Sequence, residues 1–358
     1  MTDEAEKASE MTRALIVLGM HRSGTSALAG LLHQSGVAMG SRLMQGRVGE
    51  NDKGFWEHDD IVALHERLLK EMGYSWDDPR LLPVHWWETG RSQYYLDQIC
   101  LLLDAEMKTE PLWAIKDPRM CRLMPLWWQV FTRLGVKPLF LHIVRNPLEV
   151  AASLERRDGL SRPLALLLWF QHNLEAVQHS AGYPRRFILF PQLLDHGEAW
   201  LQAVFQGWGL SAIARDHAGV SGAPPFLTRT LRHHQATDAD LKADQEVPRL
   251  VKDLYQLLLE AASAEREPAP EQVQRIVQEY QEATTLLAPW TGLSAHFQGL
   301  LEKRNALLEK RDARIAELAP ALKDAQRYVR ERERDIERLN GDLAALTENI
   351  KTLQNKTE

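Results

Sequence analysis

The sequence has few cysteines, no long apolar run and no excess of positive charge. Two cysteines among 358 residues do not make a disulfide framework and fit a reducing compartment. A formal net charge of −6 argues against general nucleic-acid binding, so any basic site must be local. No apolar run approaches the roughly 20 residues of a membrane span, and the polar, acidic segment 1–11 does not resemble a signal peptide. We therefore expect a soluble, cytoplasmic protein without a transmembrane segment.

The stretch from residue 14 to residue 32 combines an apolar β-branched run, a glycine turn and an Ala/Leu-rich segment with helical spacing. The run from Ala14 to Leu18 predicts a buried parallel strand, and a helix is expected from Thr25 onward. The first N–H groups of a helix have no acceptor within the helix, and the helix dipole favours negative charge. The turn from Gly19 to Gly24 is therefore predicted to hold a phosphate group.

This turn lacks the lysine of a Walker A loop. Gly19 and Gly24 have the Walker A separation and Ser26 stands at the final hydroxyl position, but Thr25 occupies the lysine position and the cation has moved to Arg22. Nucleoside triphosphatases need that lysine on the β- and γ-phosphates. We therefore expect a phosphate-like ligand other than ATP with Mg²⁺. The alternative is an ordinary turn that binds nothing.

The segment Arg22-Ser23-Gly24-Thr25-Ser26 resembles the 5′-phosphosulfate loop of sulfotransferases that use 3′-phosphoadenosine 5′-phosphosulfate (PAPS). Residues 139–153 resemble the family's 3′-phosphate motif, because Arg145 and Ser153 have its eight-residue offset. A 3′-phosphate is a dianion near neutral pH, which an arginine fork and a hydroxyl donor match well. The resemblance covers roughly residues 12–235. It implies PAPS as the sulfuryl donor and these cofactor-binding residues: His21, Arg22, Ser23, Gly24, Thr25, Ser26, Arg145 and Ser153.

Sulfuryl transfer to a hydroxyl or an amine needs a base that takes the proton of the acceptor. The pattern Asn51-x-x-Gly54-Phe55-Trp56-Glu57 resembles a stretch of bacterial glycan sulfotransferases, so Glu57 is the first candidate. Residues 47–50 resemble the glutamate segment of tyrosylprotein sulfotransferases, which makes Glu50 the second candidate, and His58 is a lesser one. Either glutamate can instead be a solvated loop residue or a helix N-terminal acid.

The tetrapeptide Lys116-Asp117-Pro118-Arg119 follows an expected strand at residues 112–115. Active sites of open α/β folds lie at the carboxyl ends of such strands. Lys-Asp-Pro resembles a segment of tyrosylprotein sulfotransferases, and Lys-x-Pro occurs in heparan relatives, which implies that Lys116 faces the sulfuryl group. Lys116 and Arg22 are then expected to stabilise the charge that grows on the nucleotide phosphate. Asp117 can instead pair with Arg119 and be purely structural.

The region from residue 74 to residue 95 is dense in aromatic side chains, namely Tyr74, Trp76, Trp86, Trp87, Tyr94 and Tyr95. Aromatic faces suit stacking against a sugar ring, whereas tryptophan more often fills a core. Together with the resemblance to bacterial enzymes, this favours a glycan acceptor and a role in the modification or capping of a surface polysaccharide. Residues 226–234 resemble a late basic loop that closes over the nucleotide. His233 and His234 do not form a metal site, and no metal is expected.

Strands that alternate with helices predict a P-loop-like parallel β-sheet flanked by helices. The expected helices span residues 59–72, 123–134, 163–179 and 193–205, and a further strand is expected at 187–190. Helices are also expected at 240–262 and 271–287, around a linker-like break at 267–270. We divide the chain into a disordered N-terminus (1–12), a sulfotransferase-type α/β domain (13–235), a helical extension and linker (236–295) and a coiled coil (296–358).

The C-terminal fifth has a seven-residue apolar repeat. The a positions are Leu301, Leu308, Ile315, Leu322, Val329, Ile336, Leu343 and Ile350, and the apolar d positions are Phe297, Leu318, Ala325, Leu339, Leu346 and Leu353. This pattern predicts a coiled coil and favours a parallel homodimer. Arginines at other d positions (Arg304, Arg311 and Arg332) weaken the seam, and Pro320 is expected to kink or interrupt the helix. The coil is also expected to space the enzyme from a glycan-synthesis partner, which can place it at the periphery of the inner membrane.

Two alternative functions belong to other classes of protein. A P-loop kinase would use the same phosphate-binding turn, but it would need the missing lysine. A noncatalytic scaffold would keep the coiled coil and use the α/β domain for docking only. A scaffold that had lost its activity would not need to keep the expected site residues. The sequence still has all four of them, Arg22, Lys116, Arg145 and Ser153, which argues against this alternative.

Overall fold

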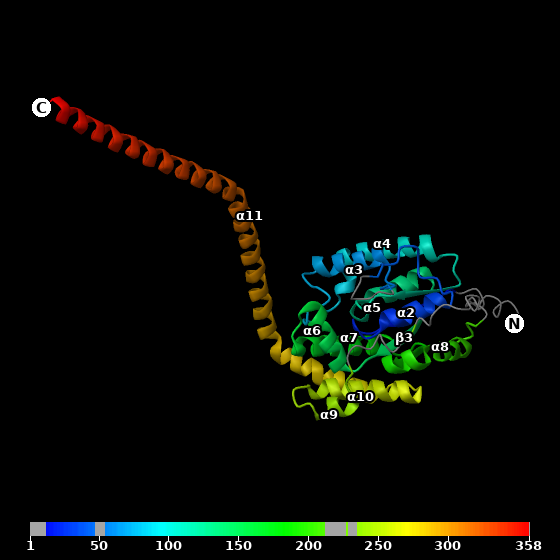
Figure 1. Ribbon diagram of the computed structural model, residues 1–358. Helices are drawn as coiled ribbons and strands as arrows, with labels where there is room; N and C mark the ends of the chain where they lie inside the picture. The colour runs from blue at the N-terminus through cyan, green and yellow to red at the C-terminus, as the bar shows by residue number, and fades with distance from the viewer. Residues whose placement is uncertain (1–11, 47–53, 212–226, 228–234, 358) are drawn as a thin grey trace, which may run out of the picture. The chain divides into compact units, whose positions relative to one another are not determined.

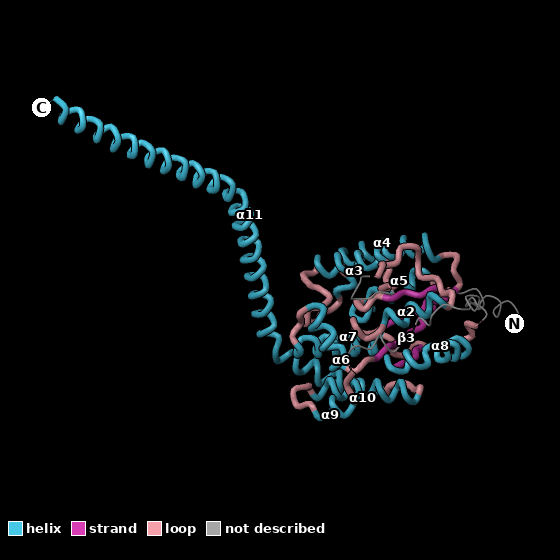
Figure 2. The backbone as a smooth tube through the Cα atoms, in the orientation of Figure 1, coloured by secondary structure: helices cyan, strands magenta, loops and turns pink. Residues whose placement is uncertain are grey.

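A computed structural model describes residues 12–46, 54–211, 227 and 235–357. Its centre is a four-stranded parallel sheet with the strand order β2-β1-β3-β4. The strands are β1 (Arg13–Leu18), β2 (Leu112–Lys116), β3 (Lys137–Val144) and β4 (Arg185–Leu189). Val17 pairs with Lys116 on one side and with Leu141 on the other. Because all strands are parallel, their carboxyl ends share one edge of the sheet, as the expected fold class requires. Figure 2 shows the strands, in magenta, among the helices, in cyan.

The helices that surround the sheet follow the strands in a regular alternation. They are α2 (Thr25–Gln34), α3 (Asp59–Glu71), the short 3₁₀ helix η1 (Trp86–Glu88), α4 (Gly90–Met107), α5 (Met120–Leu134), α6 (Pro147–Asp158), α7 (Arg162–His179), α8 (Phe190–Gly207), α9 (Asp238–Ala243), α10 (Arg249–Ala264) and α11 (Pro270–Thr357). Figure 1 shows α3 and α4 on one side of the sheet and α8 on the other. The crossover helices therefore bury both faces of the sheet.

Side-chain alternation along β1 explains how one strand serves two apolar cores. Ala14, Ile16 and Leu18 pack with residues of α3, α4 and α5. Leu15 and Val17 point to the opposite face and pack with α2 and α8. A third cluster joins α6 and α7 to α10 and to the start of α11. Because both faces of the sheet are covered, a strand can be apolar at every position. This explains why the strand segments are nearly continuous apolar runs in the sequence.

Several element boundaries differ from the sequence-based expectation. Strand β4 ends at Leu189, and Phe190 begins α8. The expected helix at 240–262 is two helices, α9 and α10, because the segment 244–248 between them contains Pro248, which lacks a backbone N–H. Helix α11 is continuous from Pro270 to Thr357, so of the two effects expected of Pro320, a kink or an interruption, the interruption does not occur.

The chain divides into two units, residues 1–283 and residues 284–358. Within the first unit, Ile276 and Val277 of α11 are buried against the α6–α7–α10 cluster. In the second unit, the described side chains between residues 303 and 351 are nearly all exposed. None of the helices in the described part of the chain combines the length and the apolar character that a membrane crossing requires.

Candidate active site

The turn between β1 and α2 has a backbone that only particular residues can adopt. Gly24 has a φ of 98°, and a Cβ atom at this position would lie 2.3 Å from the Phe190 ring. Arg22 also has a positive φ, of 67°, which is an unfavourable conformation for a non-glycine residue. Helix α2 begins directly after Gly24. The expected strand, turn and helix are therefore present, and the first-turn N–H groups of α2 begin at the carboxyl edge of the sheet.

The glycine turn and the segment from Arg145 to Ser153 meet at this edge, although they lie far apart in the sequence. The Arg22 Nε donates a hydrogen bond to the Ser153 Oγ at 2.8 Å, across 131 residues of chain. The Arg145 guanidinium donates to the backbone carbonyl of Arg22 at 3.0 Å. Arg145 follows β3, and Ser153 lies on α6, which is capped by the side chain of Asn146. The sequence predicted that Arg145 and Ser153 hold one phosphate group together, whereas the contact between Arg22 and Ser153 was not predicted.

A buried carboxylate accompanies these two arginines. The Arg145 Nε donates to Glu149 Oε2 at 2.8 Å, and the other oxygen of Glu149 accepts the N–H of Ala236 at 3.1 Å. Phe190 covers the Arg145 guanidinium, whose central carbon lies 4.5 Å from the ring centroid. We call Arg22, Arg145, Glu149 and Ser153 the phosphate cluster. Sequence reasoning missed Glu149 and Phe190, although Glu149 lies only four residues after Arg145, in the first turn of the expected helix.

Two polar atoms of the turn are buried without a hydrogen-bond partner among the described residues. They are the Ser23 Oγ and the His21 Nε2. The His21 ring packs 4.4 Å from the ring centroid of Trp76. Burial lowers the pKa of His21 well below its usual value, and the nearby Arg119 and His172 lower it further. A neutral imidazole and an unpaired hydroxyl in a buried turn are groups that a polar ligand can satisfy.

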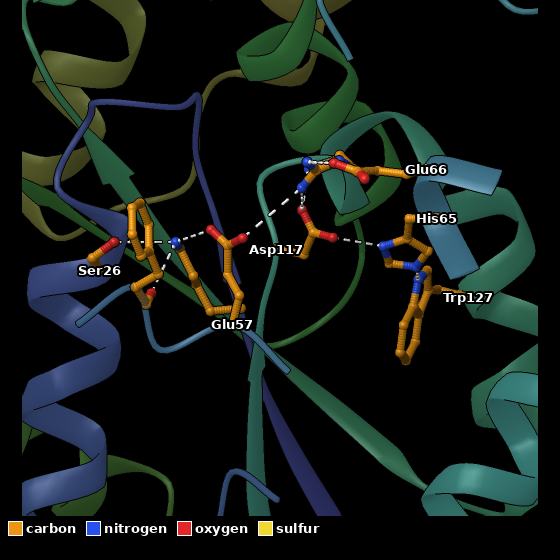
Figure 3. A network of polar contacts seen from close by, with 9 residues as sticks. Ser26, Glu57, His65, Glu66, Asp117 and Trp127 are labelled. Carbon is orange, nitrogen blue, oxygen red and sulfur yellow. Dashed lines mark hydrogen bonds and ion pairs between the residues drawn. The ribbon is translucent and has the colours of Figure 1, made fainter. Parts of the chain in front are cut away.

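A second cluster of charges lies at the end of β2 (Figure 3). The Lys116 Nζ donates to the Ser26 Oγ at 3.1 Å, to the Phe55 carbonyl at 3.2 Å and to Glu57 Oε1. The other oxygen of Glu57 lies 3.9 Å from Arg119 NH1. Lys116 and Glu57 are both buried. The structure thus brings the first candidate base, the lysine of the tetrapeptide and the final hydroxyl of the turn into direct contact.

Arg119 continues this cluster toward α3. It donates to Asp117 Oδ1 at 2.9 Å and to Glu66 Oε1 at 2.6 Å. The expected pairing of Asp117 with Arg119 is therefore present. We call Glu57, Glu66, Lys116, Asp117 and Arg119 the lysine–carboxylate cluster. Glu66 was not expected from the sequence, because only the packing of α3 beside the end of β2 brings it to Arg119.

Asp117 is also held from its other side. The His65 Nδ1 lies 2.8 Å from Asp117 Oδ2, and the Trp127 Nε1 donates to the His65 Nε2 at 3.0 Å. Since the indole N–H can only donate, neutral His65 carries its proton on Nδ1 and donates it to Asp117. Burial alone would raise the pKa of Asp117, but the Arg119 guanidinium and the His65 hydrogen bond hold it well below its usual range.

Local backbone pairing positions Glu57. Leu43 forms an antiparallel bridge with His58, and the N–H of Met44 donates to the Glu57 carbonyl at 2.8 Å. The His58 Nε2 lies 3.1 Å from Glu106 of α4. His58, the lesser candidate base, is therefore directed to Glu106, whereas Glu57 reaches Lys116.

The aromatic region at 74–95 serves mainly the core. Trp86 and Tyr95 are buried in the cluster of α3, α4 and α5, and Tyr74 and Trp87 pack against that cluster. Tyr94 is exposed on α4. Trp76 is half-buried and packs against the α6–α7–α10 cluster, and its ring also contacts that of His21. Of these six aromatic side chains, Trp76 is therefore the one that lies beside the turn between β1 and α2.

Some expectations fall on parts of the chain that the structure does not describe. Glu50 and the segment 47–53 lie outside the described residues, and so does the basic loop at 226–234 apart from Leu227. Among the described residues, no group of three or more His, Cys, Asp or Glu side chains is arranged to hold a metal ion.

The sequence matches no protein-family model and no curated protein. Among solved structures, the chain is similar to the sulfotransferase domain from the curacin biosynthetic pathway, with 13% identity, a TM-score of 0.38 and coverage of 76% of this chain and 99% of that chain. It is also similar to the sulfotransferase domain of the Synechococcus PCC 7002 olefin synthase, with 14% identity, a TM-score of 0.36 and coverage of 76% and 96%. A third similar structure is the sulfotransferase STF1 from Mycobacterium tuberculosis H37Rv, with 14% identity, a TM-score of 0.36 and coverage of 71% and 79%. At such low identities and TM-scores, these similarities do not by themselves assign an activity to the chain.

Proposed function

We propose that this chain is a sulfotransferase that moves the sulfuryl group of PAPS to a hydroxyl of a glycan acceptor. The observation that carries the proposal is the contact between the two motifs. Arg22 bonds Ser153 at 2.8 Å, and Arg145 bonds the carbonyl of Arg22 at 3.0 Å. Two guanidinium groups that follow the carboxyl ends of β1 and β3, together with a hydroxyl from α6, match a phosphate dianion.

The residues present fit a nucleotide that carries both a 3′-phosphate and a 5′-phosphosulfate. Arg145 and Ser153 would hold the 3′-phosphate. The buried, unpartnered atoms of Ser23 and His21, together with the first turn of α2, would hold the 5′ side. Bound there, the nucleotide supplies the sulfuryl group. A P-loop kinase is disfavoured because Thr25 stands where the P-loop lysine is needed.

Glu57 is the proposed base that accepts the proton of the acceptor hydroxyl. Its carboxylate is buried and held between Lys116 and Arg119. The orientation of the carboxylate is therefore fixed before an acceptor binds. Lys116 contacts Ser26 at the start of α2 as well as Glu57. The same ammonium group can therefore stabilise negative charge that develops beside the phosphate-binding turn.

A glycan is the proposed acceptor class, with a role in modifying or capping a surface polysaccharide. The support among the described residues is Trp76, whose ring stands next to His21 of the turn. An aromatic face beside the reaction centre suits the apolar face of a sugar ring. A hydroxyl is the proposed acceptor group and an amine is the alternative, since either one gives up a proton to the base as its bond to sulfur forms.

Calorimetric titration with 3′-phosphoadenosine 5′-phosphate, compared with ADP and Mg²⁺, tests the donor. We expect micromolar binding of the 3′-phosphorylated nucleotide, and we expect Arg145→Ala to abolish it. Arg133→Ala removes an arginine that pairs with Asp97 at the surface of α5 and serves as the matched control with unchanged binding. Preferential binding of ADP with Mg²⁺ would contradict the proposal and favour a kinase. Binding of neither nucleotide would favour a scaffold.

Glu57→Gln tests the base. We expect the affinity for 3′-phosphoadenosine 5′-phosphate to stay unchanged and turnover to fall by about 10²–10⁴-fold. Turnover is measured as release of 3′-phosphoadenosine 5′-phosphate from PAPS in the presence of a panel of glycan acceptors. The control is Glu155→Gln, at an exposed position of α6. Full turnover in Glu57→Gln would exclude Glu57 as the base.

A further inference from the structure

The second unit carries an apolar stripe that the described residues do not cover. Six successive a and d positions at its C-terminal end are apolar: Ile336, Leu339, Leu343, Leu346, Ile350 and Leu353. Each of them is between 54% and 64% exposed. We call residues 336–353 the zipper segment. A helix that exposes such a stripe gains little stability by itself, because most helical stability in proteins comes from the packing of an apolar face.

The zipper segment differs from the preceding part of the helix. Between residues 301 and 332, the d positions include Arg304, Arg311 and Arg332. Pro320 also removes one helical hydrogen bond in that part. From Ile336 onward, no charged residue occupies an a or d position. The zipper segment spans about 27 Å at 1.5 Å per residue, and it presents the longest uninterrupted apolar seam on α11.

We propose that the zipper segment pairs with the same segment of a second copy of this chain to form a parallel, in-register, two-stranded coiled coil. The residue types favour a coiled coil of two helices, because Ile and Leu occupy the a positions and Leu occupies every d position. A seven-residue repeat of this kind matches an identical helix, since knobs at a and d enter holes between the same positions of the partner.

Charge supports the parallel direction. In a parallel pair, each g position faces the e position five residues later in the partner. Asp335 then faces Asn340, and Asp342 faces Thr347, so each acid meets a neutral polar side chain. In an antiparallel pair, g positions face one another, which would bring the Asp342 residues of the two chains together. Arg332, at the layer before the zipper segment, lies 3.7 Å from Asp335 of its own chain, which balances part of its charge at the seam.

The oligomeric state of the full-length chain tests this pairing. Sedimentation equilibrium is expected to give twice the chain mass of 40.9 kDa. Leu343→Lys/Leu346→Lys places charge in the seam and is expected to give the single-chain mass. The control, Ala344→Lys/Ala345→Lys, adds the same charge at the outer b and c positions and should stay dimeric. A monomeric wild type, a trimer or tetramer, or a dimer that persists in the seam variant would overturn the proposal.

Cysteine cross-linking tests the direction and the register. A disulfide needs Cα atoms within about 7 Å. Leu339→Cys puts the two introduced thiols at the same d layer in a parallel pair, whereas an antiparallel pair centred on the zipper segment would separate them. We expect oxidation to link Leu339→Cys chains and to leave Glu337→Cys, at an outer position, unlinked. The native Cys100 and Cys121 are buried and do not interfere. A dimer in which Leu339→Cys fails to link would overturn the parallel arrangement.

Discussion

The two charge clusters at the carboxyl edge of the sheet are both largely buried, but their charge balance is opposite. In the phosphate cluster, the guanidinium groups of Arg22 and Arg145 accompany one carboxylate, Glu149. In the lysine–carboxylate cluster, two cations accompany three carboxylates. The first cluster therefore has one excess positive charge, which favours an incoming anion, whereas the second has one excess negative charge. The comparison teaches that adjacent strand ends of one sheet can carry buried clusters whose net charges have opposite signs.

The largest expected effect comes from breaking the pair of Lys116 and Glu57. Lys116→Met leaves the Glu57 carboxylate buried without its ammonium partner, and we expect a loss of about 3–5 kcal/mol in the free energy of unfolding. The measurement is urea unfolding followed by tryptophan fluorescence. Lys116→Met/Glu57→Leu replaces the pair by apolar groups and should recover most of the loss. Equal losses in the single and double variants would show that the charge is not the cause.

Asp117→Asn tests the pH dependence of the same cluster. The folded-state pKa of Asp117 lies well below its usual range, so its stabilisation is fully present above about pH 4 and is lost as the pH falls toward the folded-state pKa. We expect the variant to be less stable by about 1.5–3 kcal/mol at pH 7. The difference from wild type should shrink when urea unfolding is repeated at about pH 3. A difference that stays constant with pH would mean that ionisation of Asp117 does not contribute.

Glu149→Gln increases the charge difference between the two clusters, because it makes the phosphate cluster more positive. The amide oxygen can still accept a hydrogen bond from Arg145. The negative charge of Glu149, which competes with a phosphate group for Arg145, is removed. We expect the affinity for 3′-phosphoadenosine 5′-phosphate to rise by about tenfold, which corresponds to about 1.4 kcal/mol. Glu155→Gln changes the same charge at an exposed position of the same helix and should have little effect. Weaker binding in Glu149→Gln would show that its charge orients Arg145 rather than opposing the ligand.

The smallest expected effect is that of Ser153→Ala. It removes one neutral hydrogen-bonding group next to Arg22, which contributes about 0.5–1.5 kcal/mol. The affinity for the 3′-phosphorylated nucleotide should fall by roughly 2- to 12-fold at that contribution. Ser35→Ala, at the C-terminal end of α2, is the control. Unchanged affinity in Ser153→Ala would remove Ser153 from the proposed phosphate site.

Much of the fold could be predicted because its signals are local. The apolar runs at β1 and β3 and the helical spacing after Thr25 lie within short windows of sequence, and the elements found there match the expectation. Where tertiary packing decides, the sequence left alternatives open. For the aromatic region that includes Trp86 and Tyr95 it allowed both a sugar contact and a place in the core, because a sequence does not distinguish a core aromatic from an exposed one. The structure buries both residues among α3, α4 and α5.

The sequence by itself determined the glycine turn between β1 and α2, the Arg145 motif, the parallel α/β class and the heptad stripe, because each depends on spacing along a few turns or strands. Only the tertiary structure decided which charges meet. Arg22 bonds Ser153 across 131 residues, Lys116 bonds Glu57 from another segment, and α3 brings Glu66 to Arg119. These contacts depend on the order of strands in the sheet and on how helices pack over its edge, which no local pattern encodes.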